Sequence, residues 1–155
     1  MGGVSPEAEA AMRPGHADAQ RMFLDIGRAQ GYVPRRSFSQ HLPTDGVWLA
    51  TTGIGRFHEL PIVAIEVAAS EGLKTWRGSL VTLEAVSPAV AILLLQDEEV
   101  RRRMSRAGAT HPEIEETLGR MLTQMREAAA RTRQRVEVYT MENLRYLHRV
   151  YVERH

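Results

Sequence analysis

Glu66 is the residue whose setting most strongly suggests chemistry. It lies inside the apolar run 62–68, which is short and rich in β-branched residues, as expected of a central strand covered on both faces. A carboxylate buried in such a strand is costly unless a cation or hydrogen bonds compensate it. A metal ion at the end of the strand would do so. The alternative is that Glu66 lies near the strand terminus, where water solvates it or an arginine pairs with it.

Asp45 offers a second carboxylate, directly before an expected strand at 47–51 that we place beside the strand of Glu66. Two carboxylates that converge at the ends of adjacent strands can bind a hard cation such as Mg²⁺ or Mn²⁺ through oxygen ligands. Such an ion can activate a water for in-line attack on a phosphodiester and stabilise the leaving oxygen. Taken alone, Asp45 is more simply a turn residue within 43–46 (Pro-Thr-Asp-Gly).

Hydrophobic periodicity predicts the elements that must position these carboxylates. We expect helices at 16–30, 75–86, 97–106, 113–133 and 141–152, and strands at 32–40, 47–51, 62–68, 90–95 and 136–140. The helix at 75–86 joins two wholly apolar strands, which predicts a crossover connection and a parallel pair. The pattern therefore indicates an α/β fold.

The order helix, three strands, helix, strand resembles the core of the PD-(D/E)XK superfamily of restriction-endonuclease-like nucleases. The resemblance covers 16–95 and is strongest at 45–48 (Asp-Gly-Val-Trp) and 66–68 (Glu-Val-Ala), with support from the lead-in 26–32 and the helix 78–84. It implies an α-β-β-β-α-β core with a mixed sheet flanked by helices, followed by C-terminal helices and a strand.

The resemblance further implies that Asp45 and Glu66 are catalytic metal ligands, helped by the main-chain carbonyl of Val67. One departure matters, because Ala68 stands where the family usually carries Lys, or in some branches Glu or Gln. Positions 66 and 68 of a strand point the same way, so a group that helps to activate water is missing.

Two interpretations of Ala68 remain open. In the first, the missing function has migrated, and Lys74 is the main candidate because it is the only lysine and opens the following helix. Glu71 is a second candidate. In the second, the site is dead and the domain only binds its partner.

Contacts with nucleic acid are expected from four cations that precede and follow the carboxylates, Arg35, Arg36, Lys74 and Arg77. They would neutralise phosphate charge, which gives affinity but reads no sequence. The arginines at 101–103 are more simply a solvated helix face. The whole chain carries 20 basic and 19 acidic residues, for a net charge of +1, and this balance by itself does not indicate nucleic acid.

Composition and length limit the remaining classes. The 155 residues suit one domain, which we expect at 16–155 after a flexible lead at 1–15 that is rich in glycine and proline. The chain has no cysteine, which excludes disulfides and thiolate metal sites. Neither a signal peptide nor an apolar run of about 20 residues is present, so we expect a cytoplasmic protein without a membrane partner.

These observations leave three hypotheses. The first is an Mg²⁺- or Mn²⁺-dependent DNA endonuclease of the restriction or defence type, which the resemblance implies would act as a homodimer or in a larger defence complex. The second is a catalytically silent domain of the same fold that serves as a DNA-binding or assembly subunit. The third is an unrelated α/β protein in which Glu66 pairs with an arginine.

Overall fold

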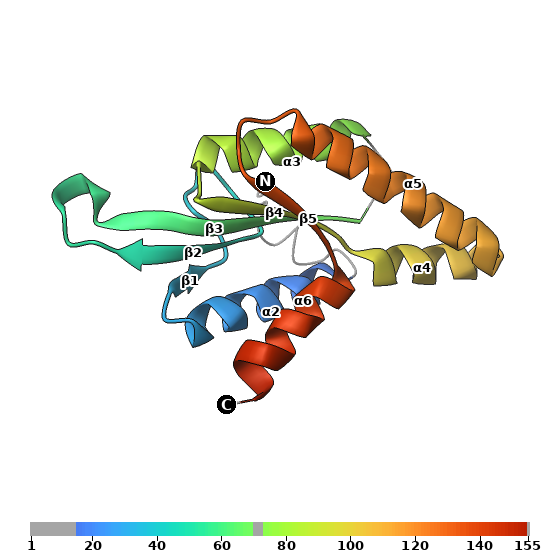
Figure 1. Cartoon of the computed structure of the whole chain (residues 1–155), viewed down its shortest axis with the longest axis horizontal. Coiled ribbons are helices and arrows are strands. Elements are labelled where there is room, and N and C mark those ends of the chain that lie inside the picture. The colour runs from blue at the N-terminus through green and yellow to red at the C-terminus, as the bar shows by residue number, and fades with distance from the viewer. Residues whose placement is uncertain (1–14, 70–72, 155) are drawn as a thin grey trace, which may run out of the picture.

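The computed structural model describes residues 15–69 and 73–154, apart from the side chains of Leu73 and Lys74 (Figure 1). Its elements in chain order are α2 (His16–Ala29), β1 (Val33–Arg35), β2 (Gly46–Thr51), the 3-10 turn η1 (Gly55–Phe57), β3 (Glu59–Ala68), α3 (Leu73–Val86), β4 (Val90–Leu95), α4 (Asp97–Arg106), α5 (His111–Ala130), β5 (Val136–Thr140), α6 (Met141–His148) and the π-helical segment η2 (Arg149–Glu153).

The five strands form one mixed sheet in the order β1-β2-β3-β4-β5. β1 is antiparallel to β2, and β2 is antiparallel to β3, whereas β3, β4 and β5 are parallel to one another. The parallel pair predicted on either side of α3 is confirmed, and so is the placement of the strand after Asp45 beside the strand of Glu66. The protein is therefore an α/β protein with a five-stranded mixed sheet flanked by helices.

Helices cover both faces of this sheet, which explains why β4 and the run 62–65 of β3 are apolar. Figure 1 shows α3 and α5 over one face and α2 and α6 over the other. The first layer packs Trp76, Leu83 and Met121 against Ala64 and Leu93. Because Met121 and Met125 of α5 are buried in this core, the apolar side of that helix covers the sheet.

The second core joins α2 to the antiparallel part of the sheet. Trp48 of β2 stacks on Phe23 with ring centroids 4.7 Å apart, and its Nε1 donates to the Phe23 carbonyl at 2.8 Å. Gly27 lies so close to the indole that an added Cβ would come within 2.4 Å of it. This contact fixes α2 against the strand that follows Asp45.

The first strand is much shorter than the predicted 32–40, which is a correction. Only Val33–Arg35 pairs with β2. After it, Ser39 accepts a hydrogen bond on its Oγ from the Leu42 N–H at 3.0 Å, and Ser37 Oγ donates to the Ser39 carbonyl at 3.1 Å. Short hydroxyl side chains offer the backbone local partners in place of a strand ladder, and here those local bonds end the strand.

The strand of Glu66 begins earlier than predicted, because 59–61 belongs to β3 and not to a loop. Pro61 suggested a loop, since proline cannot donate to a ladder. It is accommodated where the pairing with β2 is irregular, at the register shift between Trp48 and Leu49. The outcome is a long β2–β3 hairpin whose far end extends past the helices on both faces of the sheet (Figure 1).

Candidate functional site

Asp45 occupies the base of the β2–β3 hairpin, one residue before β2 begins. Its backbone N–H donates to the Ile65 carbonyl at 3.1 Å, and its Oδ2 accepts from the Val67 N–H at 2.7 Å. The Asp45 side chain thus adds a hydrogen bond to β3 next to the backbone pairing of β2 and β3, which begins with Gly46 and Ile65. Only 8 % of Asp45 is exposed, so these bonds hold the carboxylate in one orientation.

Two polar residues of α2 complete the surroundings of Asp45, and the sequence did not single out either of them. His16 Nε2 lies 2.8 Å from Asp45 Oδ1, and Gln20 donates from Nε2 to the Asp45 carbonyl at 2.8 Å. They are four residues apart and so share one helix face. A polar pair at this spacing, beside an apolar stripe that starts at Ala19, was the available signal.

Glu66 is brought to Asp45 across the same strand pair. It is half-buried on β3, and its side chain is hydrogen-bonded with that of Asp45. Burial raises the pKa of the Asp45 carboxyl, but hydrogen bonds with His16, Glu66 and the Val67 N–H outweigh burial and hold this pKa below its usual value. Asp45 is therefore anionic at neutral pH.

The backbone of Val67 faces Asp45, because its N–H donates to the Asp45 carboxylate. In an antiparallel pair, the N–H and C=O of one residue point to the same neighbouring strand, so the Val67 carbonyl faces the base of β2 as well. The structure therefore brings together the three positions that the resemblance implied as ligands, namely Asp45, Glu66 and Val67.

Ala68 is buried in the core beneath α3, in the same cluster as Trp76. The position where the family carries a polar group is thus occupied by apolar packing. The structure describes the side chain of neither Glu71 nor Lys74, the two candidates for the water-activating group that Ala68 lacks. Glu71 lies outside the described residues, and Lys74 belongs to the first turn of α3 but its side chain is not described.

Gln96 is a further polar residue at this end of the sheet that the sequence did not indicate. It directly follows β4, where its N–H donates to the Ala68 carbonyl at 2.8 Å. Its buried side chain donates from Nε2 to the Gly15 carbonyl, next to His16, at 2.8 Å. Within the described part of the chain, its Oε1 has no hydrogen-bond partner.

The three arginines expected to contact nucleic acid lie in different surroundings. Arg35 donates from Nη2 to Glu59 Oε1 at 2.7 Å. Arg36 lines a hollow with residues of α2, whereas Arg77 lies on α3, on the face of the sheet where Ala68 is buried. The arginines of α4 form ion pairs, Arg101 with Glu115 and Arg102 with Glu99, which agrees with a structural role for that charged run.

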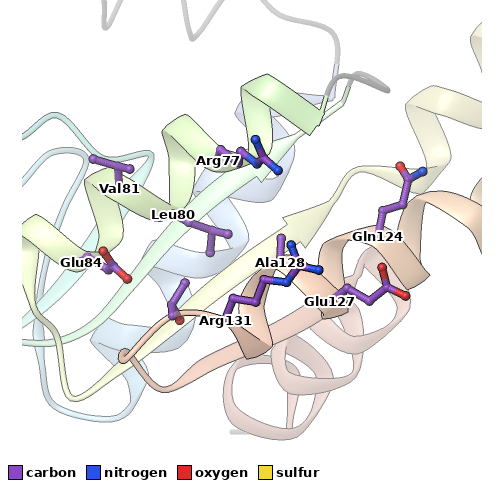
Figure 2. Close-up of a pocket in the computed structure, with 9 residues that line it drawn as sticks. Arg77, Leu80, Val81, Glu84, Gln124, Glu127, Ala128 and Arg131 are labelled. Atoms are coloured by element: carbon purple, nitrogen blue, oxygen red, sulfur yellow. The ribbon is translucent and has the colours of Figure 1, made fainter.

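Arg77 borders a hollow of about 540 Å³ between α3 and α5 (Figure 2). Two arginines and two glutamates line it, Arg77 and Arg131 with Glu84 and Glu127. These opposite charges balance, so the hollow is not a cationic surface for phosphates. Neither Asp45 nor Glu66 borders it.

No family model matches the chain, and neither a curated protein nor a solved structure shows significant similarity to it. In the part of the chain that the structure describes, no helix combines the length and the apolar character that crossing a bilayer requires.

Proposed function

We propose that this protein is a metal-dependent phosphodiesterase, a DNA endonuclease of the restriction or defence type with a restriction-endonuclease-like fold. Asp45 and Glu66 would hold the Mg²⁺ or Mn²⁺ ion. The observation that carries the proposal is the hydrogen bond between these two carboxyl groups at the base of the β2–β3 hairpin. Two neighbouring carboxyl groups, one buried and one half-buried, offer the oxygen ligands that a hard divalent cation prefers.

The donor set fits such an ion in number and in kind. Mg²⁺ is usually bound by one or two carboxylates, with water and substrate phosphate oxygens in the other positions. Asp45, Glu66 and the Val67 carbonyl offer only oxygen atoms. Among the described residues no group of three or more His, Asp or Glu side chains could hold a metal, so the remaining positions would be left to water and phosphate.

The surrounding residues would orient the ligands. The Val67 N–H and His16 each engage one oxygen of Asp45, and Gln20 fixes the backbone of the same residue. Partners of this kind hold a ligand in place and tune its basicity. When bound, the ion would supply an activated water and stabilisation of the leaving oxygen.

A second function is favoured by one observation, the burial of Ala68 in the apolar core. If no other group replaces the one that this position lacks, the protein is a catalytically silent nuclease-fold domain that binds DNA or assembles with a partner. In either case we place it in the cytoplasm. An active restriction-type enzyme would cut both strands as a homodimer or within a larger defence complex.

The test combines cleavage with direct metal binding. Purified full-length protein is incubated with plasmid and linear DNA and Mg²⁺ or Mn²⁺, beside Glu66→Gln, Asp45→Asn and an EDTA control. Glu84→Gln is the matched control, because Glu84 is an exposed glutamate on α3. Mn²⁺ binding is followed by electron paramagnetic resonance. We expect Glu66→Gln and Asp45→Asn to lose both cleavage and Mn²⁺ binding, and Glu84→Gln to keep both.

The outcomes separate the two functions. Cleavage that survives Glu66→Gln contradicts the proposed site. Mn²⁺ binding and DNA binding without cleavage, with several target sequences tried, favour the silent domain. If the wild type cuts, Lys74→Ala tests whether Lys74 supplies the water-activating group that Ala68 lacks. A loss of cleavage with retained Mn²⁺ binding would assign that role to Lys74.

A further inference from the structure

The far end of the β2–β3 hairpin exposes large apolar side chains. The exposed fractions are 69 % for Ile54, 56 % for Phe57 and 40 % for Leu60. Single exposed apolar residues are common and need no explanation. Here Ile54 and Phe57 lie in one short connection and Leu60 follows near the start of β3, at the end of the hairpin that extends beyond the two helical layers (Figure 1).

This hairpin tip, residues 52–58, is held in shape by its own hydrogen bonds. Thr52 binds both ends of the turn, because its N–H donates to the His58 carbonyl at 2.7 Å and its Oγ accepts from the Ile54 N–H at 3.0 Å. The Phe57 N–H donates to the Ile54 carbonyl at 2.9 Å. The apolar side chains are therefore presented on a formed turn, which lowers the entropic cost of binding a partner.

The charge of the hairpin tip indicates the kind of partner. Residues 51–58 include Arg56 and His58 but no carboxylate. The Arg56 guanidinium lies 5.2 Å from the centre of the Phe57 ring. The next carboxylate along the chain, Glu59, is already paired with Arg35. An apolar wedge beside a cation complements a polyanion with a stacked apolar interior, and duplex DNA is such a polymer.

The distance between Asp45 and the hairpin tip would allow both to contact one DNA duplex. β2 has six residues between Asp45 and the hairpin tip. At about 3.3 Å per residue, the strand spans about 20 Å. This distance corresponds to about six base pairs at 3.4 Å each.

We propose that the hairpin tip is a DNA wedge: Phe57 and Ile54 insert between base pairs from the minor groove, and Arg56 contacts a neighbouring phosphate. The inference rests on the proposed function for its choice of DNA as the partner. Proteins that insert apolar side chains in this way partly unstack and kink the duplex. The wedge would bend the DNA about six base pairs from the carboxylates.

The test uses full-length protein and a 2-aminopurine-labelled duplex of about three helical turns, long enough to cover the roughly six base pairs between wedge and carboxylates. The variants are the double change Ile54→Ser with Phe57→Ser, the single change Arg56→Gln, and Val81→Ser as the control. Val81 is 64 % exposed on α3, far along the chain from the hairpin. Circular dichroism checks that each variant is folded, and sedimentation measures its oligomeric state.

We expect the double variant to bind about tenfold more weakly or worse and to lose the fluorescence rise of the unstacked base. Arg56→Gln should weaken binding on all sequences and reduce the slope of log K against log salt by about 1. Val81→Ser should match the wild type.

Other outcomes overturn the inference. One is a folded double variant that binds and unstacks the duplex like the wild type. Another is loss of a dimer with unchanged DNA affinity, which would make the hairpin tip a contact between two copies. A wild type that binds no duplex overturns it as well.

Glu66→Gln separates this inference from the proposed function, since it should abolish cleavage but keep wedge-dependent binding. Binding that depends on the wedge without any cleavage supports the wedge and refutes the nuclease. Cleavage by the wild type, together with DNA binding that the double variant retains in full, supports the nuclease and refutes the wedge.

Discussion

The two ends of the β2–β3 hairpin differ in almost every physical respect. The base carries polar groups that are buried and held by one another, with Asp45 between His16 and the Val67 N–H. The tip carries apolar groups in water, with Phe57 and Ile54 exposed. At the base, packing of α2 on Trp48 sets the geometry, whereas at the tip only local hydrogen bonds do. Changes at the base should therefore affect stability and chemistry together, and changes at the tip should affect binding alone.

The largest effect is expected from Trp48→Ala, which detaches the hairpin from α2. It removes a buried ring that stacks on Phe23 and an indole hydrogen bond to the Phe23 carbonyl. Truncating a buried aromatic residue of this size costs about 3–5 kcal/mol of unfolding free energy. Urea unfolding followed by circular dichroism measures it. A cost below about 1 kcal/mol would mean that α2 does not fix the base.

Asp45→Asn comes next, because it disturbs the bonds at the base without changing side-chain size. We expect a loss of about 1.5–3 kcal/mol at pH 7, the usual range for hydrogen bonds to a charged group. Asp18→Asn is the matched control, since Asp18 lies on the exposed side of α2 and forms an exposed ion pair with Arg21 at 3.3 Å. Equal unfolding free energies for the two variants would contradict a structural role of Asp45.

The same pair of variants gives a pH test. The pKa of Asp45 in the folded protein lies below its usual value of 3.8. Its contribution to stability is thus present above pH 3.8 and is lost as the pH falls through the folded pKa. The difference in unfolding free energy between wild type and Asp45→Asn should narrow from pH 5 to pH 2. A difference that stays constant would show that Asp45 titrates as it does in the unfolded chain.

A smaller effect is expected partway up the hairpin, where Arg35 of β1 and Glu59 of β3 form an ion pair that is partly exposed. A double-mutant cycle with Arg35→Gln and Glu59→Gln should give a coupling of about 0.2–1 kcal/mol. About 1 M salt should reduce it, because exposed charges are screened. A coupling that salt does not change would mean that the pair is shielded from solvent.

The smallest effect on stability is expected at the hairpin tip. Phe57→Ser should leave the unfolding free energy within about 0.5 kcal/mol of the wild type, since an exposed ring loses little when it is removed. Thermal unfolding measures it beside Trp48→Ala. A cost near that of Trp48→Ala would show that the ring is part of the core, and the contrast between base and tip would fail.

The sequence by itself determined the elements whose information is local. The apolar strand at 90–95, the alternating strand at 136–140 and the charged helix at 97–106 have the predicted bounds in the structure. Periodicity is set within a few neighbouring residues, and the burial of both sheet faces follows from it. The crossover through α3 likewise required only the order of the elements. The adjacency of Asp45 and Glu66 was predicted in the same way.

Only the tertiary structure decided what surrounds these carboxylates and what the hairpin exposes. His16 and Gln20 reach Asp45 across more than twenty residues of chain, and Gln96 reaches Gly15 across eighty-one. No local pattern encodes such contacts, because each depends on how α2 docks on Trp48. The exposure of Phe57 is likewise not local: its residue type predicts burial, and only the length of β2 and β3 beyond the helices places it in water.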